Sequence, residues 1–203
     1  MAVELDHVFI RASAGAPEAD LLVSFGLTEG RPNRHPGQGT ACRRFFFRNA
    51  MLELLWVEDA VAAAWPLQLV ERISPFGVCA RPADPLEAAV PFAAWEYRPS
   101  YLPEPLVIHM AAGCPLEEPL WFYLGFGVRP ERTPEHSCGF GEVTGARLSS
   151  PVGAPSDAMA VMVREKVVTV ERGSEHLLEL TFDGGGQKRT CDFRPNLPLV
   201  FRW

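Results

Sequence analysis

The order of strand-like and helix-like segments in the first 60 residues constrains the fold more than any other feature of the chain. Residues 3–12 are rich in β-branched and apolar side chains, which is typical of a buried strand. Residues 16–27 carry leucines at helical spacing and end near Gly26, which predicts a short helix. Residues 40–50 and 51–59 then have the character of two further strands. This region predicts a strand–helix–strand–strand unit.

A weak repeat relates this unit to the second half of the chain. A Phe–Gly dipeptide follows His7 by 18 positions, and another follows His109 by 17. Each half also contains an apolar strand-like segment with an acid at its centre, Glu53 in the first and Glu179 in the second. Each half therefore offers a histidine on an early strand and a glutamate on a late one.

The latter half of the chain can also be aligned with the first unit in a second way. A strand-like segment around Cys79, followed by helix-like residues, begins the second unit in this alignment. Cys79 then takes the position of His7, and His109 falls on the last strand. Residues 143–183 form a further partial unit, and Glu179 moves away from the site.

These patterns give a provisional division of the chain. Residues 1–60 form the first unit, and 61–103 form a connecting segment that also offers a start for the second unit. Residues 104–203 form the second unit with a C-terminal tail. Within it, 176–193 predict a hairpin with a glycine-rich turn, and the tail from 191 predicts an edge strand or an interface.

Composition and charge narrow the partners. The net charge of −6 supplies no positive field for phosphate backbones, so we expect neither nucleic acid nor membrane as a partner. No uninterrupted apolar run approaches the ~20 residues of a membrane helix, and the N-terminal residues lack the pattern of a signal peptide. A cytoplasmic protein is the expectation. The five cysteines are odd in number and form no Cys-x-x-Cys pair, which argues against a disulfide framework.

Several short motifs resemble one protein family. The segments LDHVFI at 5–10, SFGL at 24–27 and MLELLWV at 51–57 are similar to the vicinal oxygen chelate superfamily. That superfamily includes glyoxalase I, extradiol dioxygenases and bleomycin-resistance proteins. The loop at 34–47 resembles that of glyoxalase-like domain proteins but departs from it at Cys42, where the family often has asparagine. The match is good over the first sixty residues and loose beyond them.

The resemblance implies an α+β fold in which repeated βαβββ modules curl into a cup-like mixed sheet around a pocket. In metal-dependent members, the ligands come from the first and last strands of each module. The matching candidates here are His7 and Glu53 in the first module and His109 and Glu179 in the second. Such a set suits zinc, nickel, manganese or iron. The resemblance also implies a small-molecule substrate and a homodimer.

The chemistry of Glu53 supports a pocket on one face of its strand. A lone carboxylate in a dry core costs several kcal/mol, so the strand must face a wet pocket, a cation or a metal. Because strand side chains alternate, Glu53 shares a face with Leu55 and not with Trp56. Arg11, Arg43 and Arg44 are the alternative partners for the acid, and Arg11 lies on the face of His7. Further candidate pocket residues complete this expectation: His35, Trp56, Arg11 and Cys79.

Two functions follow from these observations. The first is a glyoxalase-like enzyme of the lyase, isomerase or dioxygenase type, in which Glu53 is a general base and a metal acts as Lewis acid. The second is a metal-free protein that binds or sequesters a small molecule, as bleomycin-resistance proteins do. In a purely structural interpretation, His7 and His109 are hydrogen-bonded core residues and Glu179 is exposed on a strand.

Overall fold

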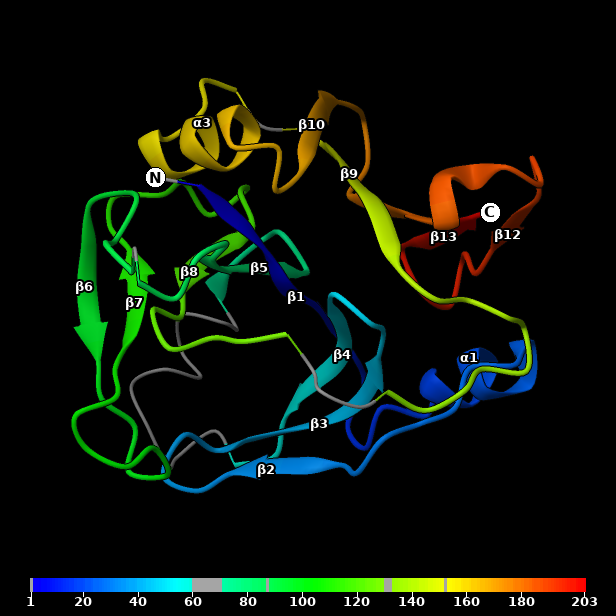
Figure 1. Ribbon diagram of the computed structural model, residues 1–203, viewed down its shortest axis with the longest axis horizontal. Coiled ribbons are helices and arrows are strands. Elements are labelled where there is room, and N and C mark those ends of the chain that lie inside the picture. The colour runs from blue at the N-terminus through cyan, green and yellow to red at the C-terminus, as the bar shows by residue number, and fades with distance from the viewer. Residues whose placement is uncertain (1, 60–70, 87, 130–132, 152) are drawn as a thin grey trace.

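The structure is a computed structural model that describes residues 2–59, 71–86, 88–129, 133–151 and 153–203 (Figure 1). Its described strands form a sheet of eight and a sheet of five. The first sheet contains β1 Val3–Arg11, β2 Asn33–His35, β3 Thr40–Phe46, β4 Met51–Val57, β5 Phe76–Pro82, β6 Ala94–Tyr97, β7 Ile108–Ala111 and β8 Leu120–Tyr123. The second contains β9 Val143–Ser150, β10 Thr169–Arg172, β11 Leu177–Phe182, β12 Thr190–Asp192 and β13 Leu199–Arg202. Helices α1 Ala19–Phe25 and α3 Asp157–Arg164 and the short turn η1 Asp183–Gly185 complete the elements.

The eight-stranded sheet is built from two related halves. Its strand order is β2-β3-β4-β1-β5-β8-β7-β6, so β1 and β5 are neighbours at its centre. Strand β1 runs parallel to β4, and β5 runs parallel to β8. The order β5-β8-β7-β6 therefore repeats β1-β4-β3-β2 on the other side of the central pair. This curled sheet (Figure 1) confirms the predicted α+β, cup-like fold.

The two halves differ in their helical parts. In the first, α1 ends at Gly26, whose left-handed φ of 116° suits a residue without a side chain. In the second, the described residues between β5 and β6 contain no helix, because Pro85 and Pro91 interrupt the segment. Across the described residues, no helix has the length and apolar character needed to cross a membrane.

The second half begins earlier than the predicted boundary at 104. It begins at β5, as in the alignment that placed Cys79 opposite His7, while residues 60–70 of the connecting segment lie outside the described residues. The segment 104–203 is divided between the two sheets. The predicted hairpin at 176–193 is not formed, because β13 lies between β11 and β12 and pairs with both. The tail from 191 thus begins with the end of the edge strand β12 and finishes with β13, an inner strand of the second sheet.

Side-chain alternation assigns the two faces of the curled sheet. Val8 and Ile10 of β1 join the large core that also contains residues of the second sheet and of α3. Phe9 of β1 and Leu55 of β4 belong to a smaller apolar cluster on the other face. The first sheet therefore buries one face against the rest of the molecule and lines a pocket with the opposite face.

Gly77 of β5 is required for the position of Phe9 beneath that pocket. A Cβ atom added at Gly77 would lie 2.0 Å from Phe9 Cε1, far inside van der Waals contact. We expect Gly77→Ala to destabilise the protein by about 1–3 kcal/mol, because Phe9 is almost fully buried and has little room to move. Denaturant unfolding measures this loss. Gly153→Ala is the control, since nothing lies within 4 Å of its added Cβ, and equal losses in the two variants would contradict the prediction.

Candidate functional site

A cavity of about 160 Å³ opens on the pocket face of the curled sheet. Strands β1 and β4 contribute one wall, β7 and β8 contribute the opposite wall, and loop residues after β2 and after β6 close the ends. Its walls are mainly apolar, with a few polar side chains among them. The lining residues are His7, Phe9, His35, Gln38, Glu53, Leu55, Tyr101, Leu102, Ile108, Phe122, Leu124 and Phe126.

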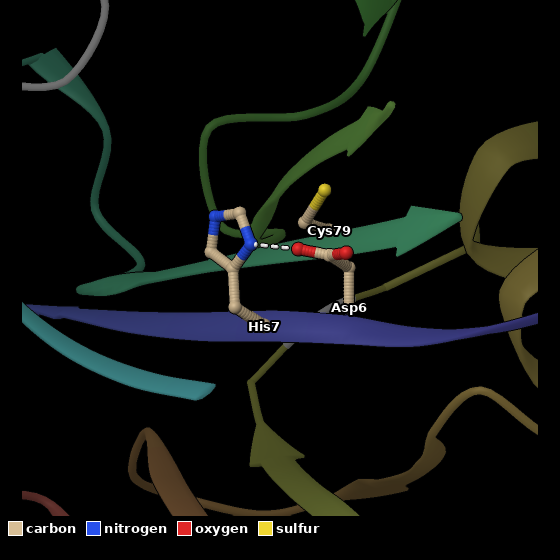
Figure 2. Close-up of side chains that lie close together, drawn as sticks. All are labelled: Asp6, His7 and Cys79. Carbon is tan, nitrogen blue, oxygen red and sulfur yellow. Dashed lines mark hydrogen bonds and ion pairs between the residues drawn. The ribbon is translucent and has the colours of Figure 1, made fainter. Parts of the chain in front are cut away.

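His7 is held at this cavity by its neighbour in sequence, Asp6. In β1, Leu5 pairs with Ala80 and His7 pairs with Cys79, so Asp6 is the extra residue of a β-bulge. The bulge turns both side chains the same way, and His7 Nδ1 lies 2.6 Å from Asp6 Oδ1 (Figure 2). This contact fixes the ring and leaves Nε2 on the side away from Asp6 (Figure 2).

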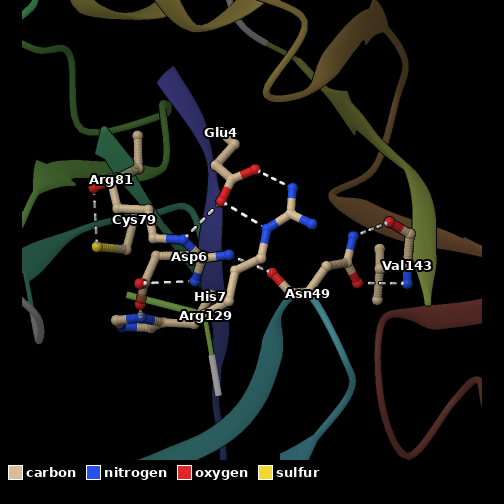
Figure 3. A network of polar contacts seen from close by, with 9 residues as sticks. Glu4, Asp6, His7, Asn49, Cys79, Arg81, Arg129 and Val143 are labelled. Carbon is tan, nitrogen blue, oxygen red and sulfur yellow. Dashed lines mark hydrogen bonds and ion pairs between the residues drawn. The ribbon is translucent and has the colours of Figure 1, made fainter. Parts of the chain in front are cut away.

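Asp6 in turn belongs to a buried charged network (Figure 3). Arg81 donates from Nη1 to Asp6 Oδ2 at 3.0 Å, from Nε to Glu4 Oε1 at 2.9 Å and from Nη2 to the Asn49 carbonyl at 2.6 Å. Arg129 reaches the same Glu4 from the surface. The Asn49 side chain accepts from the Val143 amide and donates to its carbonyl, which ties the network to the second sheet.

The charges around His7 favour its protonated form. Burial alone disfavours the charged ring, but the Asp6 hydrogen bond and the nearby carboxylates of Glu53 and Asp6 outweigh burial. The pKa of His7 therefore lies above its ordinary value of 6.5. The same hydrogen bond and the Arg81 charge keep the pKa of Asp6 below its usual value, although burial opposes this.

This shift predicts a pH-dependent contribution of His7 to stability. A histidine whose folded-state pKa is raised stabilises the fold fully below its unfolded pKa, about 6.5. The contribution is lost as pH rises through the raised folded-state pKa. We expect the difference in unfolding free energy between wild type and His7→Asn to shrink from about pH 5 to about pH 9. Denaturant unfolding at each pH measures it, and a difference that grows with pH would contradict the assignment.

Glu53 faces the same cavity from β4. Its register partner on β1 is Phe9, two residues beyond His7. The Cys42 thiol donates to Glu53 Oε1 at 3.6 Å, and burial, reinforced by the Glu53 charge, raises the pKa of Cys42. Within the described structure, no hydrogen bond or ion pair joins Glu53 to His7. The acid and the imidazole thus face the cavity separately.

A hydrogen-bonded chain forms another part of the lining. Tyr101 donates to Gln38 Oε1 at 2.8 Å, and Gln38 Nε2 donates to Thr40 Oγ1 at 2.7 Å. His35 Nδ1 lies 2.9 Å from the same hydroxyl, and its Nε2 lies 3.0 Å from Asn33 Nδ2. Because Asn33 Nδ2 is a donor, His35 Nε2 accepts, and the ring is neutral. Burial also lowers the pKa of His35.

The four predicted metal ligands do not come together. His109 lies on β7 between Ile108 and Met110, which face the pocket side, and its ring packs against Tyr123 on the other face. Glu179 lies on β11 in the second sheet, where it forms ion pairs with Arg147 and Arg202. Of the predicted ligands, His7 and Glu53 line the cavity.

The symmetry of the sheet identifies the true counterparts of these two residues. Cys79 of β5 pairs with His7 across the central strands. His7 pairs with Met51, two residues before Glu53, and Cys79 pairs with Phe122, two residues before Leu124. Leu124 therefore stands where a second carboxylate would be, and it has no ligand atom. The described residues do not fit the three or four protein ligands of a metal centre in this pocket.

One cluster of metal-type donors does occur beside the cavity. Ligand atoms of Asp6, His7 and Cys79 lie within 4.8 Å of one another (Figure 2). Asp6 and His7 use these atoms for their mutual hydrogen bond, and Asp6 also accepts from Arg81. Burial raises the pKa of the Cys79 thiol, which donates to the Ala80 carbonyl. Hydrogen bonding between protein groups accounts for this cluster.

The remaining predicted pocket residues have mixed positions. His35 lines the cavity, as described above. Cys79 is fully buried beneath it in the pocket-side cluster. Trp56 packs against the large core on the opposite face, in keeping with strand alternation. Arg11 donates to the Arg72 carbonyl and is not among the lining residues.

Sequence patterns did not predict several residues of the site. Asp6 precedes His7 in the quoted motif, but a regular strand would point the two side chains in opposite directions. Arg81 lies in the buried strand β5, and its local sequence gives no sign of its three partners. Tyr101 and Gln38 lie in loops, 63 positions apart, and meet through the fold.

Comparison with known proteins adds information about the fold. No protein-family model matches the chain, and no curated protein matches it in sequence. A hypothetical protein from Staphylococcus aureus superposes with a TM-score of 0.50 at 12% identity, covering 98% of this chain and 99% of that chain. This likeness shows a shared fold.

Two further solved structures superpose with lower TM-scores. Methylmalonyl-CoA epimerase from Streptomyces coelicolor, as a variant in complex with 2-nitronate-propionyl-CoA, matches with a TM-score of 0.41 and 14% identity. It covers 61% of this chain and 97% of that chain. A hypothetical protein from Bacillus halodurans C-125 gives a TM-score of 0.45 at 12% identity, over 66% of this chain and 99% of that chain. At these values, the likeness carries no inference about activity.

Proposed function

We propose that the protein is an enzyme of the vicinal oxygen chelate type that moves a proton on a small oxygenated molecule, as an isomerase or lyase does. The proposal rests mainly on one observation. His7, oriented by Asp6, and Glu53 enter the same largely apolar cavity from adjacent strands without bonding to each other. A base and an acid of different type, on adjacent strands of one cavity wall, are the groups that proton transfer at carbon requires.

The roles follow from the positions of the two groups. The Glu53 carboxylate accepts a proton from the carbon next to a substrate carbonyl. The electron pair of the broken C–H bond forms the C=C bond of an enolate, and negative charge develops on the carbonyl oxygen. Protonated His7 donates from Nε2 to that oxygen, because Nδ1 is committed to Asp6. On an α-hydroxyketone, Glu53 then returns its proton to the former carbonyl carbon while the other hydroxyl of the enediol gives its proton back to His7, so the carbonyl group moves to the neighbouring carbon.

No step in this proposal passes through a metal. Of the lining donors, His7 and Glu53 are free of each other, but Leu124 stands where a further carboxylate would be needed. His35 also lines the cavity, and both of its ring nitrogens are engaged by Thr40 and Asn33. A dioxygenase with a His–His–Glu iron site is therefore not proposed. We expect α-proton exchange to persist after the protein is treated with a chelator. Loss of exchange would show that the reaction requires a divalent metal.

The apolar lining supports a second candidate, a metal-free binding protein. Seven of the twelve lining residues are Phe, Leu or Ile, and such walls favour binding whether or not chemistry follows. The Asp6–His7 pair favours the enzyme, since a sequestering pocket has no use for an imidazole that a carboxylate orients and whose pKa it raises.

Hydrogen–deuterium exchange separates these candidates. Neutral ketones and α-hydroxyketones are incubated with the protein in D₂O, and loss of the α-proton signal is followed by NMR. We expect exchange above the buffer rate in wild type and its loss in His7→Asn. His109→Asn is the matched control, because His109 faces away from the cavity. Ligand binding without exchange across the panel would favour the binding protein.

A further inference from the structure

The charges at the cavity define which molecules it accepts. Among the described residues that line it, none is Lys or Arg. The charged groups are His7 and Glu53, and these have opposite sign. Arg44 pairs with Glu53 across β3 and β4, but its guanidinium donates to the Arg31 carbonyl and lies over the Phe46 ring. The cation that an anionic group on a ligand would meet is His7, which is already paired with Asp6 and lies near the Glu53 carboxylate. No arginine or lysine among the lining residues is left to balance the added negative charge.

The dimensions of the cavity limit the size of the ligand. Its volume of about 160 Å³ is close to that of an apolar cavity of about 150 Å³ that binds benzene. The aromatic residues Phe9, Phe122 and Phe126 and the aliphatic residues Leu55, Ile108 and Leu124 supply the walls. A single ring, or an aliphatic group of similar size, fills such a space.

The polar groups leave few hydrogen bonds for a ligand. Both nitrogens of His35 are engaged, by Thr40 and by Asn33. Tyr101 donates its proton to Gln38 and keeps its oxygen as an acceptor. With His7 and Glu53, the cavity therefore recognises one or two neutral oxygen groups on an otherwise apolar molecule.

From charge, size and hydrogen bonding together, we infer that the cavity binds an uncharged ketone or hydroxyketone with a single-ring-sized apolar body. Carboxylates, phosphate esters and acyl-CoA compounds are excluded from it. The reaction of such a ligand at this site rests on the proposed function. The binding preference of the cavity does not depend on it. The inference names the substrate class of the same site.

Two nearly isosteric probes test the charge preference. Phenylacetone and phenylacetate have the same number of non-hydrogen atoms and differ by a methyl group against an ionised oxygen. Binding of each is measured by ligand-observed NMR titration against the full chain. We expect phenylacetone to bind at least about tenfold more tightly, since phenylacetate brings a negative charge into an apolar site where His7 is already paired with Asp6. Equal or tighter binding of phenylacetate, or no binding of phenylacetone, overturns the inference.

A substitution at the loop wall checks that binding occurs in this cavity. Leu102 lines the cavity from the loop between β6 and β7, outside the strands. Leu102→Arg places a cation beside the ligand and is expected to reverse the preference toward phenylacetate. Leu86→Arg is the matched control, because Leu86 is 93% exposed and does not line the cavity. A reversal in neither variant, or in both, contradicts the assignment of the site.

The same samples distinguish failure of the inference from failure of the proposed function. In D₂O, phenylacetone exposes exchangeable α-protons to Glu53 and His7. Binding of phenylacetone without exchange of its α-protons supports the inferred class of ligand and argues against proton transfer at this site. Exchange of other neutral ketones without binding of phenylacetone supports proton transfer and overturns the ring-sized ligand.

Discussion

Replacing Glu53 with Gln is expected to lower the rate of α-proton exchange by about 10²–10⁴-fold, the range that a positioned general base contributes. The amide has the shape of the carboxylate but cannot accept the proton. The substitution also removes a negative charge that raises the pKa of His7, so His7 should titrate at lower pH in the variant. NMR exchange rates and the His7 titration measure the two effects on the same protein.

The control for this variant is Glu179→Gln. Glu179 has the same position in an apolar strand, but it is bound to Arg147 and Arg202 in the second sheet. The control should keep the exchange rate and the His7 titration while losing stability. If the two variants exchange protons equally fast, Glu53 is not the base.

Replacing Arg81 with Met is expected to cost about 3–5 kcal/mol of stability, the range measured when one partner of a buried ion pair is removed. Arg81 is 2% exposed, and its loss leaves Asp6 and Glu4 without their shared cation (Figure 3). Methionine fills much of the volume, so the loss reflects charge rather than a cavity. Linear extrapolation of denaturant unfolding gives the value.

Arg129→Met is the matched control, because Arg129 pairs with the same Glu4 but its side chain is 58% exposed. An exposed ion pair contributes about 0–1 kcal/mol. Similar losses in the two variants would show that Arg81 does not stabilise the site through buried charge.

The first half of the curled sheet was predictable because its signals are local. The alternation around Glu53 fixed which side chains share a face, and Gly26 marked the end of α1. His7 and Glu53 lie at the first and last strands of that half, and both line the cavity. The resemblance to a known superfamily rested on the same residues.

The second half was not predictable from spacing, because strand pairing over long distances decides it. His109 and a following Phe–Gly dipeptide repeat the spacing around His7, yet β7 presents His109 to the opposite face. The counterpart of His7 is Cys79, which pairs with it across the centre of the sheet. The alternative alignment had placed Cys79 in this position, but it was wrong to put His109 on the last strand, because β8 and not β7 is the counterpart of β4.

Glu53 and Glu179 likewise could not be distinguished from their local sequences. Each is a glutamate at the centre of an apolar strand, and their local sequences do not distinguish them. The difference lies in the neighbouring strands, which give Glu179 two arginines and give Glu53 a thiol and a cavity. These neighbours are set by the fold, as is the bulge that brings Asp6 to His7.

The most direct test is an NMR titration of the His7 imidazole in wild type and in Asp6→Asn. The structure predicts a wild-type pKa above 6.5, with Nδ1 as the hydrogen-bonding nitrogen, and a lower pKa in Asp6→Asn. This result would show the oriented, protonated histidine on which proton transfer depends. A wild-type pKa below 6.5 that Asp6→Asn leaves unchanged would contradict the Asp6–His7 pair and, with it, the proposed chemistry.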